Sequence, residues 1–259
     1  MKSSKKSYLK LGLLLLFFIF YWLIVNLLFH NTGLFWLLLL AGIALTVIAK
    51  NYRKLSKRDW ITAIILGFLA VFSNPIFAAL TVLTYLASSL LLKEKEKFST
   101  LLKLDSPKQA ALALILGLLV GFVLGFLNLA SAHKPISLPG SFPIQAVLDA
   151  LRAGVFEEVA FRLFFFAIIF YLTKKDTFSK MENMLVYGIL TLPHTLIHFG
   201  LEKFYIGSVV ILSLVFGLPF AFLLRKQGLY SAITAHTVVD LLRFVFFRNL
   251  KNFNLKYKW

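Results

Sequence analysis

Ionisable side chains interrupt the most apolar stretches in the second half of this chain. The first group is Glu157-Glu158-x-x-x-Arg162, which places two carboxylates beside one guanidinium. On a helix Glu158 and Arg162 are four residues apart and share a face, so we expect them to pair. Glu157 points about 100° away from that face and is left without the arginine. Such a carboxylate suits a general base that takes a proton from water. The alternative is a structural ion-pair cluster that seals a helix bundle.

Two more groups follow, each with a spacing of four residues. His194 and His198 share one helix face directly after Pro193, and His236 shares a face with Asp240. A carboxylate near an imidazole fixes its tautomer, so we expect Asp240 to orient His236. The alternatives are that His198 caps the outer end of its helix and that His236 and Asp240 only stabilise theirs.

The energetic cost of these groups argues that they have a function. Five charges fall within the apolar run 146–172, namely Asp149, Arg152, Glu157, Glu158 and Arg162. Each charge near the centre of a lipid-facing helix costs ~2.5–3.5 kcal/mol, so five would cost roughly 12–18 kcal/mol. We therefore expect them to face the protein interior or a hydrated cavity. Because Glu157, His194 and His236 all lie well inside their apolar runs, they can converge on one point.

The remaining sequence predicts the helices that position these groups. The chain has 259 residues, of which 59% are hydrophobic, more than in a typical soluble domain. Runs of helix-spanning length occur at 9–29, 34–49, 60–72, 76–92, 110–130, 146–172, 184–203, 204–224 and 229–247. Because the third run is short and Ser73-Asn74-Pro75 separates it from the fourth, the prediction is an all-α polytopic transmembrane bundle of eight or nine spans. The first run is too long for a signal peptide and has no cleavage site, so we expect an uncleaved span.

The charge distribution predicts the orientation. The formal net charge is +17, with Lys and Arg in short loops between apolar runs. This pattern indicates a multi-pass cell-membrane protein with a cytoplasmic N-terminus and contact with anionic lipids, and it argues against nucleic acid as a partner. The basic tail after 247 disagrees, since nine spans would place it outside. The chain has no cysteine, which excludes disulfides, a thiolate nucleophile and cysteine-ligated zinc.

Polar residues inside the membrane are concentrated in the second half. We therefore predict one continuous membrane domain with a packing portion at 1–130 and a C-terminal catalytic core at 131–259. In the run 110–130, Gly117, Gly121 and Gly125 recur every four residues, which favours close helix packing.

The three groups together resemble a known family. Glu157-Glu158-x-x-x-Arg162, Leu190-x-x-x-His194 and His236-x-x-x-Asp240 are similar to the motifs of the CAAX-processing and bacteriocin-immunity intramembrane proteases. That family includes type II CAAX prenyl endopeptidases and bacterial Abi proteins. The resemblance covers 146–247, with one departure: Leu190 stands where the family has phenylalanine. We assign His194 as the motif histidine and keep His198 in reserve.

The resemblance implies an intramembrane endopeptidase that hydrolyses a peptide bond in a membrane-associated protein or peptide. Glu157 would activate water and His194 would position it. His236 would stabilise the oxyanion or share in binding the water, while Glu158 and Arg162 hold their helix in place. No cofactor is expected, although Glu157, His194 and His236 would be the ligands if zinc were bound.

Several possibilities stay open from the sequence. The pathway could be CAAX-type processing, bacteriocin or pheromone maturation, or immunity. Outside proteolysis, the alternatives are a non-enzymatic membrane scaffold or immunity protein of the same fold and a proton-coupled transporter. The oligomeric state is not readable from the chain.

Overall fold

The fold is helical throughout the part of the chain that the structure describes. The computed structural model describes residues 2–29, 32–72, 74–93, 101–102, 106–131, 144–175 and 177–247, and all regular elements in these ranges are helices. This confirms the predicted all-α class. The basic C-terminal tail used in the sequence analysis lies outside these ranges.

The described part of the first half contains the helices α1 (Lys2–Leu28), α2 (Thr32–Asn51), α3 (Lys57–Ala70), α4 (Pro75–Leu92) and α6 (Pro107–Ser131), and the short 3₁₀ turn η1 (Tyr52–Lys54). Capping residues in the sequence fix the N-terminal ends of two of these helices, α3 and α4. Ser56 and Asp59 form a capping box at α3. Asn74 accepts a hydrogen bond from the Ile76 amide at α4, and Pro75 follows in the first helical position.

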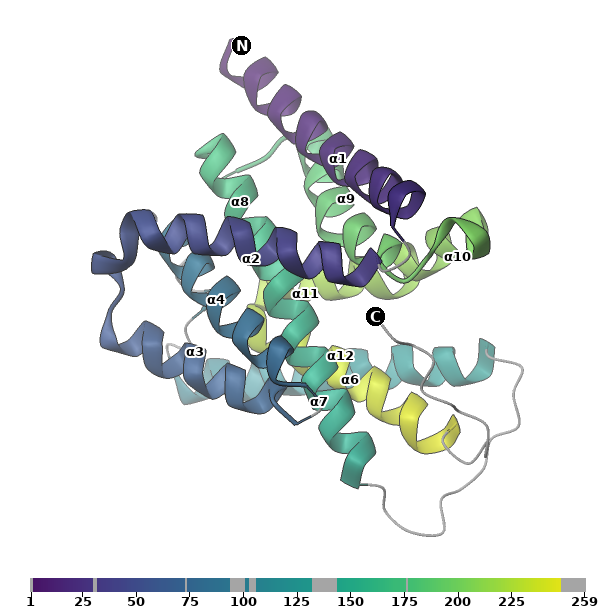
Figure 1. The fold of residues 1–259 in the computed structure, drawn as a ribbon. Helices are drawn as coiled ribbons and strands as arrows, with labels where there is room; N and C mark the ends of the chain where they lie inside the picture. Colours follow the sequence, from purple (N-terminus) through teal and green to yellow (C-terminus); the bar gives the residue numbers. More distant parts are fainter. Residues whose placement is uncertain are drawn as a thin grey trace.

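The second half contains two long helices that are each interrupted by a π-helical turn. One rod consists of α7 (Ile144–Glu157), the π turn η2 (Glu158–Leu163) and α8 (Phe164–Thr173), and it runs through the middle of the molecule (Figure 1). The other consists of α10 (Ile206–Ile211), the π turn η4 (Leu212–Gly217) and α11 (Leu218–Gln227). The remaining elements are α9 (Lys180–Leu196), η3 (Leu201–Lys203) and α12 (Leu229–Phe247).

The number of spans is only partly supported. Among the residues that the structure describes, six helical stretches are long and apolar enough to cross a bilayer: Lys6–Leu28, Thr32–Lys54, Pro75–Leu92, Pro107–Ser131, Ile206–Gln227 and Leu229–Phe247. The eight or nine spans are therefore not confirmed. Helix α3, with 14 residues, rises only about 21 Å, less than the roughly 30 Å of hydrocarbon in a bilayer. Helix α9 has 17 residues, and the α7–α8 rod carries the charges of the first motif.

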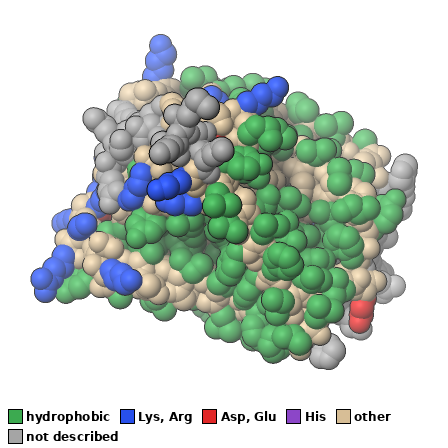
Figure 2. Space-filling view, turned by 90° about the horizontal axis from the view of Figure 1, so that it is seen from above, with side chains coloured by type: hydrophobic (Ala, Val, Ile, Leu, Met, Phe, Trp, Pro, Cys, Tyr) green, Lys and Arg blue, Asp and Glu red, His purple; other side chains and the backbone are tan. Residues whose placement is uncertain are grey.

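The outer surface agrees with a multi-pass membrane protein. Figure 2 shows hydrophobic side chains over most of one face, with Lys and Arg gathered towards one end. Large apolar side chains on α1, α2, α3 and α6 are exposed, as expected for helices that contact lipid.

Helix α12 is held between α6 and α7 by glycines. A Cβ atom on Gly121 would lie 2.8 Å from the Ala235 carbonyl oxygen of α12. A Cβ on Gly154 of α7 would lie 2.2 Å from Thr237 Oγ1. The predicted packing role of the small residues in α6 is confirmed, since only glycine allows this approach.

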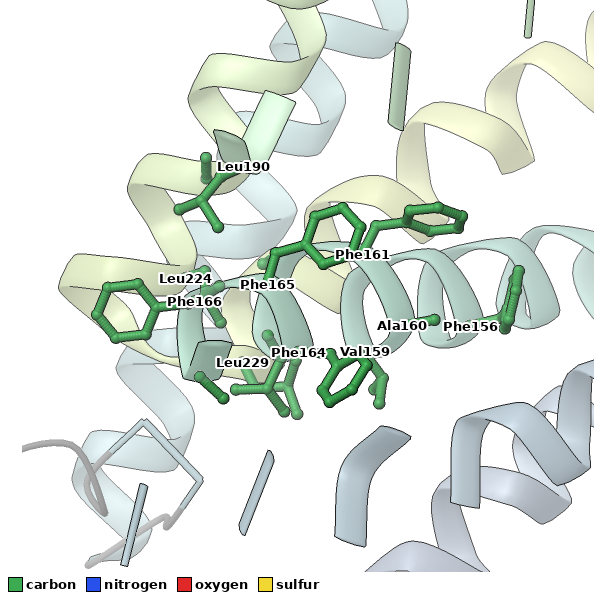
Figure 3. Packing of buried hydrophobic residues seen from close by; sticks show 14 of the residues in the cluster. Phe156, Val159, Ala160, Phe161, Phe164, Phe165, Phe166, Leu190, Leu224 and Leu229 are labelled. Carbon is green, nitrogen blue, oxygen red and sulfur yellow. The ribbon is translucent and has the colours of Figure 1, made fainter. Parts of the chain in front are cut away.

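The rod that carries the first motif is sheathed in buried aromatic residues. Figure 3 shows Phe156, Phe161, Phe164, Phe165 and Phe166 projecting around it on several sides. Phe165 stacks on Phe18 of α1 with ring centroids 4.4 Å apart, and Phe156 packs on Phe77 of α4 at 4.6 Å. These contacts join α1 and α4 to the rod. The division at residue 130 stays a prediction.

Candidate active site

The start of α9 is anchored by a polar cluster, and this anchoring sets the position of His194 further along the helix. Ser179 and Glu182 form a capping box, and Lys175 Nζ donates to Glu182 Oε1 at 2.5 Å. Burial by itself would raise the pKa of Glu182, but the hydrogen bonds from Lys175 and the Ser179 amide lower that pKa to about 2. The carboxylate is therefore ionised at neutral pH and keeps the helix start in place.

Glu157 is the point at which three helices meet. Its Oε2 lies 2.6 Å from His194 Nε2 of α9 and 3.4 Å from His236 Nε2 of α12. All three side chains are buried. The convergence predicted from their depth is thus confirmed, although it joins residues 37 and more positions apart in sequence.

Glu158 and Arg162 form the pair expected from their spacing. Arg162 Nη1 donates to Glu158 Oε1 in a short contact, and both side chains are fully buried. Each partner also reaches one of the histidines. Arg162 Nη2 lies 3.3 Å from His194 Nδ1, and Glu158 Oε1 lies 2.7 Å from His236 Nδ1. The pair therefore contacts both imidazoles on the side away from Glu157.

These contacts define opposite tautomers for the two histidines. An arginine only donates, so His194 Nδ1 must accept, and the proton of the neutral ring is then on Nε2, facing Glu157. Glu158, which accepts from Arg162, also accepts from His236 Nδ1–H, so a neutral ring of His236 presents an unprotonated Nε2. The site thus combines one N–H donor and one nitrogen acceptor around the same carboxylate oxygen.

Asp240 does not have the role that the sequence predicts. Its Oδ2 lies 3.7 Å from His236 Nε2, beyond hydrogen-bond distance, whereas Glu158 bonds Nδ1 directly. The carboxylate that orients His236 is therefore Glu158. The i,i+4 spacing places Asp240 beside the Nε2 edge of the His236 ring, which is also the edge that faces Glu157. The Nδ1 atom therefore bonds to Glu158, a residue of another helical segment.

Phe220 of α11 is a site residue that the sequence analysis missed. Its ring stacks on His236 with centroids 4.8 Å apart and planes at 12°, and the Arg162 guanidinium lies 5.2 Å from its centroid. The ring is buried. No sequence signal separates this phenylalanine from the other 27 in the chain.

The remaining predicted residues lie at the margin or away from the site. The His198 ring meets His194 edge-on at 5.1 Å, but its side chain is exposed. Asp149 accepts a hydrogen bond from Gln145, and the Arg152 guanidinium lies over the Phe77 ring at 5.1 Å. These last two charges, expected to face the interior, have partners other than the motif residues.

The residues present do not fit a zinc ion bound through His194. Potential ligand atoms of Glu157, His194 and His198 lie within 4.8 Å of one another, a different set from the predicted one with His236. Metal ligation by His194 Nε2 would require that nitrogen to lose its proton, which would place N–H at Nδ1. That N–H would face the Arg162 donor at 3.3 Å, so two donors would oppose each other.

Comparison with known proteins agrees with this geometry. Residues 139–242 match the family model described as Rce1-like, type II CAAX prenyl endopeptidase. The matched residues contain all three motifs and the parts of α7, α9 and α12 that meet at Glu157. Over these residues the chain is similar to the CAAX-processing family of membrane proteases.

The matched family is one of type II CAAX prenyl endopeptidases. The apolar helices of the chain agree with a membrane location. No curated protein and no solved structure matches the chain.

Proposed function

We propose that this chain hydrolyses a peptide bond of a membrane-associated protein or peptide with a water molecule activated by Glu157. The observation that carries the proposal is the position of Glu157 Oε2, 2.6 Å from one imidazole nitrogen and 3.4 Å from another within a buried site. A general base must lie within hydrogen-bond distance of the water that it deprotonates, next to a partner that holds this water in place. The imidazoles beside Glu157 can be such partners.

The tautomers assign the two histidines to different tasks. The unprotonated Nε2 of His236 accepts one O–H of the water, while Glu157 accepts the other. Of the two roles predicted for His236, water binding is thus the one that its contact with Glu158 supports. His194 Nε2–H is a neutral donor next to Glu157, and it suits the oxyanion that forms on the scissile carbonyl.

The reaction then proceeds by addition and collapse. The water oxygen bonds to the carbonyl carbon while its proton moves to Glu157. The C–N bond breaks as the tetrahedral intermediate collapses, and the proton on Glu157 passes to the leaving nitrogen. One water is consumed, and the products are a new carboxyl terminus and a free amine. Since zinc ligation through His194 does not fit the donors present, no step involves a metal.

Replacing Glu157 by glutamine tests the proposal. Glu157→Gln keeps the size and the ability to accept from His194 but removes the base, so cleavage of a prenylated peptide in proteoliposomes should fall by about 10²–10⁴-fold. The matched control is Glu202→Gln, at an exposed glutamate, which should leave the rate unchanged.

Two results would contradict the mechanism. Full cleavage by the Glu157→Gln variant would remove this residue as the base. Activity that disappears with a strong chelator and returns with zinc would overturn the metal-free reaction. Cleavage of a non-prenylated apolar peptide at an equal rate would favour bacteriocin or pheromone maturation over CAAX-type processing.

A further inference from the structure

Helix α1 contacts the helices of the site although it lies outside residues 139–242, which match the family model. It runs alongside α9 (Figure 1). Near the start of α1, Lys10 Nζ donates to the carbonyl oxygen of Leu172 in α8 at 2.6 Å. Further along, Trp22 Nε1 donates to the carbonyl oxygen of Phe199 at 2.9 Å, directly after α9. Helix α1 is thus hydrogen-bonded at the C-terminal ends of both α8 and α9.

The C-terminal end of α9 needs such a contact from outside the helix. Pro193 has no N–H group, so it cannot donate to the Ile189 carbonyl, and the last turn is held less firmly. The last carbonyl groups of a helix also require partners from elsewhere. Trp22 supplies one at Phe199, since its side chain is buried and the indole N–H is its polar group.

Trp22 also contacts the far end of the segment that follows α9. Its ring and the ring of Phe204 have centroids 5.2 Å apart, and Phe204 comes directly after η3. One side chain of α1 therefore contacts both ends of the stretch 199–204. Asn26, one turn further along α1, lies against the same stretch, because a Cβ on Gly200 would be 3.6 Å from Asn26 Oδ1.

The position of this stretch affects the geometry of the site. His194 lies in the last turn of α9, and the Phe199 amide donates to the Leu196 carbonyl of the same turn at 3.0 Å. His194 Nε2 lies 2.6 Å from Glu157 Oε2. Movement of the turn away from Glu157 by about 1 Å would lengthen this contact beyond hydrogen-bond distance.

We propose that Trp22 is a positioning residue: its bond to the Phe199 carbonyl fixes the end of α9, so that His194 stays within hydrogen-bond distance of Glu157. This inference rests on the proposed function. Trp22 acts through α9 and takes no part in the chemistry itself. Displacement of a reacting group by about 1 Å can lower a rate by about a hundredfold, so the effect belongs to kcat.

The test is Trp22→Phe, which keeps an aromatic ring for the contact with Phe204 but removes the N–H donor. For the full-length protein in proteoliposomes, kcat for a prenylated peptide should fall about ten- to a hundredfold with little change in KM. Amide hydrogen exchange at 197–199, measured by mass spectrometry, should become about two- to tenfold faster, as expected for the loss of one hydrogen bond.

The matched control is Tyr21→Phe on the same helix. It removes the hydrogen bond from the Tyr21 hydroxyl to the carbonyl oxygen of Phe35 in α2, which is 2.6 Å long. This variant should change neither kcat nor the exchange at 197–199. A second test variant, Phe204→Leu, removes the ring contact but keeps the indole bond, and it should accelerate the same exchange by a smaller factor. Because Phe204 is exposed, this variant should fold normally.

Four results in Trp22→Phe would overturn the inference. The first is an unchanged kcat with unchanged exchange. The second is faster exchange at 197–199 with an unchanged kcat, since the end of α9 would then not need to be fixed. The third is a fall in kcat without faster exchange, since the effect would not pass through α9. The fourth is a lower melting temperature with an unchanged kcat per folded molecule, which would make the role of Trp22 purely structural.

Failure of the proposed function gives a different result. In that case the unmodified protein does not cleave the peptide, and the role of Trp22 in the reaction is overturned with it. The exchange measurements on Trp22→Phe and Tyr21→Phe need no activity, so they still decide whether Trp22 holds the end of α9.

Discussion

At the scale of single residues, the chemistry depends on which ring nitrogen of each histidine carries a proton. Arg162 and Glu158 decide this, because one only donates and the other accepts. The ion pair between them is therefore more than a support for its helix. It gives His194 and His236 complementary hydrogen-bonding edges towards Glu157, which two unassisted imidazoles would adopt only part of the time.

Phe220 should contribute to the reaction through His236. Phe220→Leu keeps an apolar side chain but removes the stacked ring and its contact with Arg162, and such aromatic and cation–π contacts contribute about 1–2 kcal/mol. We expect kcat to fall about tenfold with little change in KM, because the ring contacts His236 and Arg162 and acts through them. The values of kcat and KM for cleavage of the prenylated peptide, measured as a function of pH, test this expectation.

The control is Phe222→Leu on the same helix, where the side chain is 50% exposed. An unchanged kcat and pH profile in Phe220→Leu would show that the stack has no role in the reaction.

At the scale of elements, the π turn η2 falls on the first motif itself. The wider turn begins at Glu158, directly after Glu157 ends α7. Inserted turns of this kind frequently mark functional sites. Here two neighbouring carboxylates reach different partners, with Glu157 directed at His194 and Glu158 at His236.

The glycine contact between α7 and α12 should be essential for the site. In Gly154→Ala the new Cβ would lie 2.2 Å from Thr237 Oγ1 and 3.0 Å from the Ile233 carbonyl oxygen, so α12 must move next to His236. Overpacking of this kind costs about 1–3 kcal/mol. We expect the Gly154→Ala variant to have a lower melting temperature in detergent and to lose peptide cleavage.

The matched control is Gly42→Ala, where a Cβ meets nothing within 4 Å and stability should be unchanged or slightly higher. Equal melting temperatures for the two variants would contradict the close packing.

At the scale of the whole molecule, the gathering of Lys and Arg at one end predicts the orientation in the membrane (Figure 2). Lys226 lies in the last turn of α11. Glu202 lies in η3, which follows the C-terminal end of α9. We expect Lys226→Cys to react with a membrane-impermeant thiol reagent from the cytoplasmic side and Glu202→Cys from the other side.

The chain suits this labelling experiment because it has no cysteine of its own. The unmodified protein is the background control. Labelling of Glu202→Cys from the cytoplasm, with Lys226→Cys protected, would reverse the orientation. Labelling of both from one side would show that the helices between them do not cross the bilayer completely.

The sequence by itself determined the features that depend on neighbours within one helix. It predicted the helical class, the pairing of Glu158 with Arg162, the shared face of His236 and Asp240, and the close packing of the glycines in α6, because side-chain periodicity encodes these relations. The family motifs were readable for the same reason. The span count is not confirmed, because α3 has only 14 residues and α9 ends at Leu196, inside the apolar run 184–203.

Only the tertiary structure decided which groups meet between helices. The partner of His236 Nδ1 is Glu158, 78 positions away, and not Asp240 on the same helix. The Phe220 stack and the contact between Arg162 and His194 likewise depend on how α7, α9, α11 and α12 pack. Periodicity states which face a residue occupies, but the depth and rotation of one helix against another follow from glycine contacts and aromatic packing summed over the whole bundle.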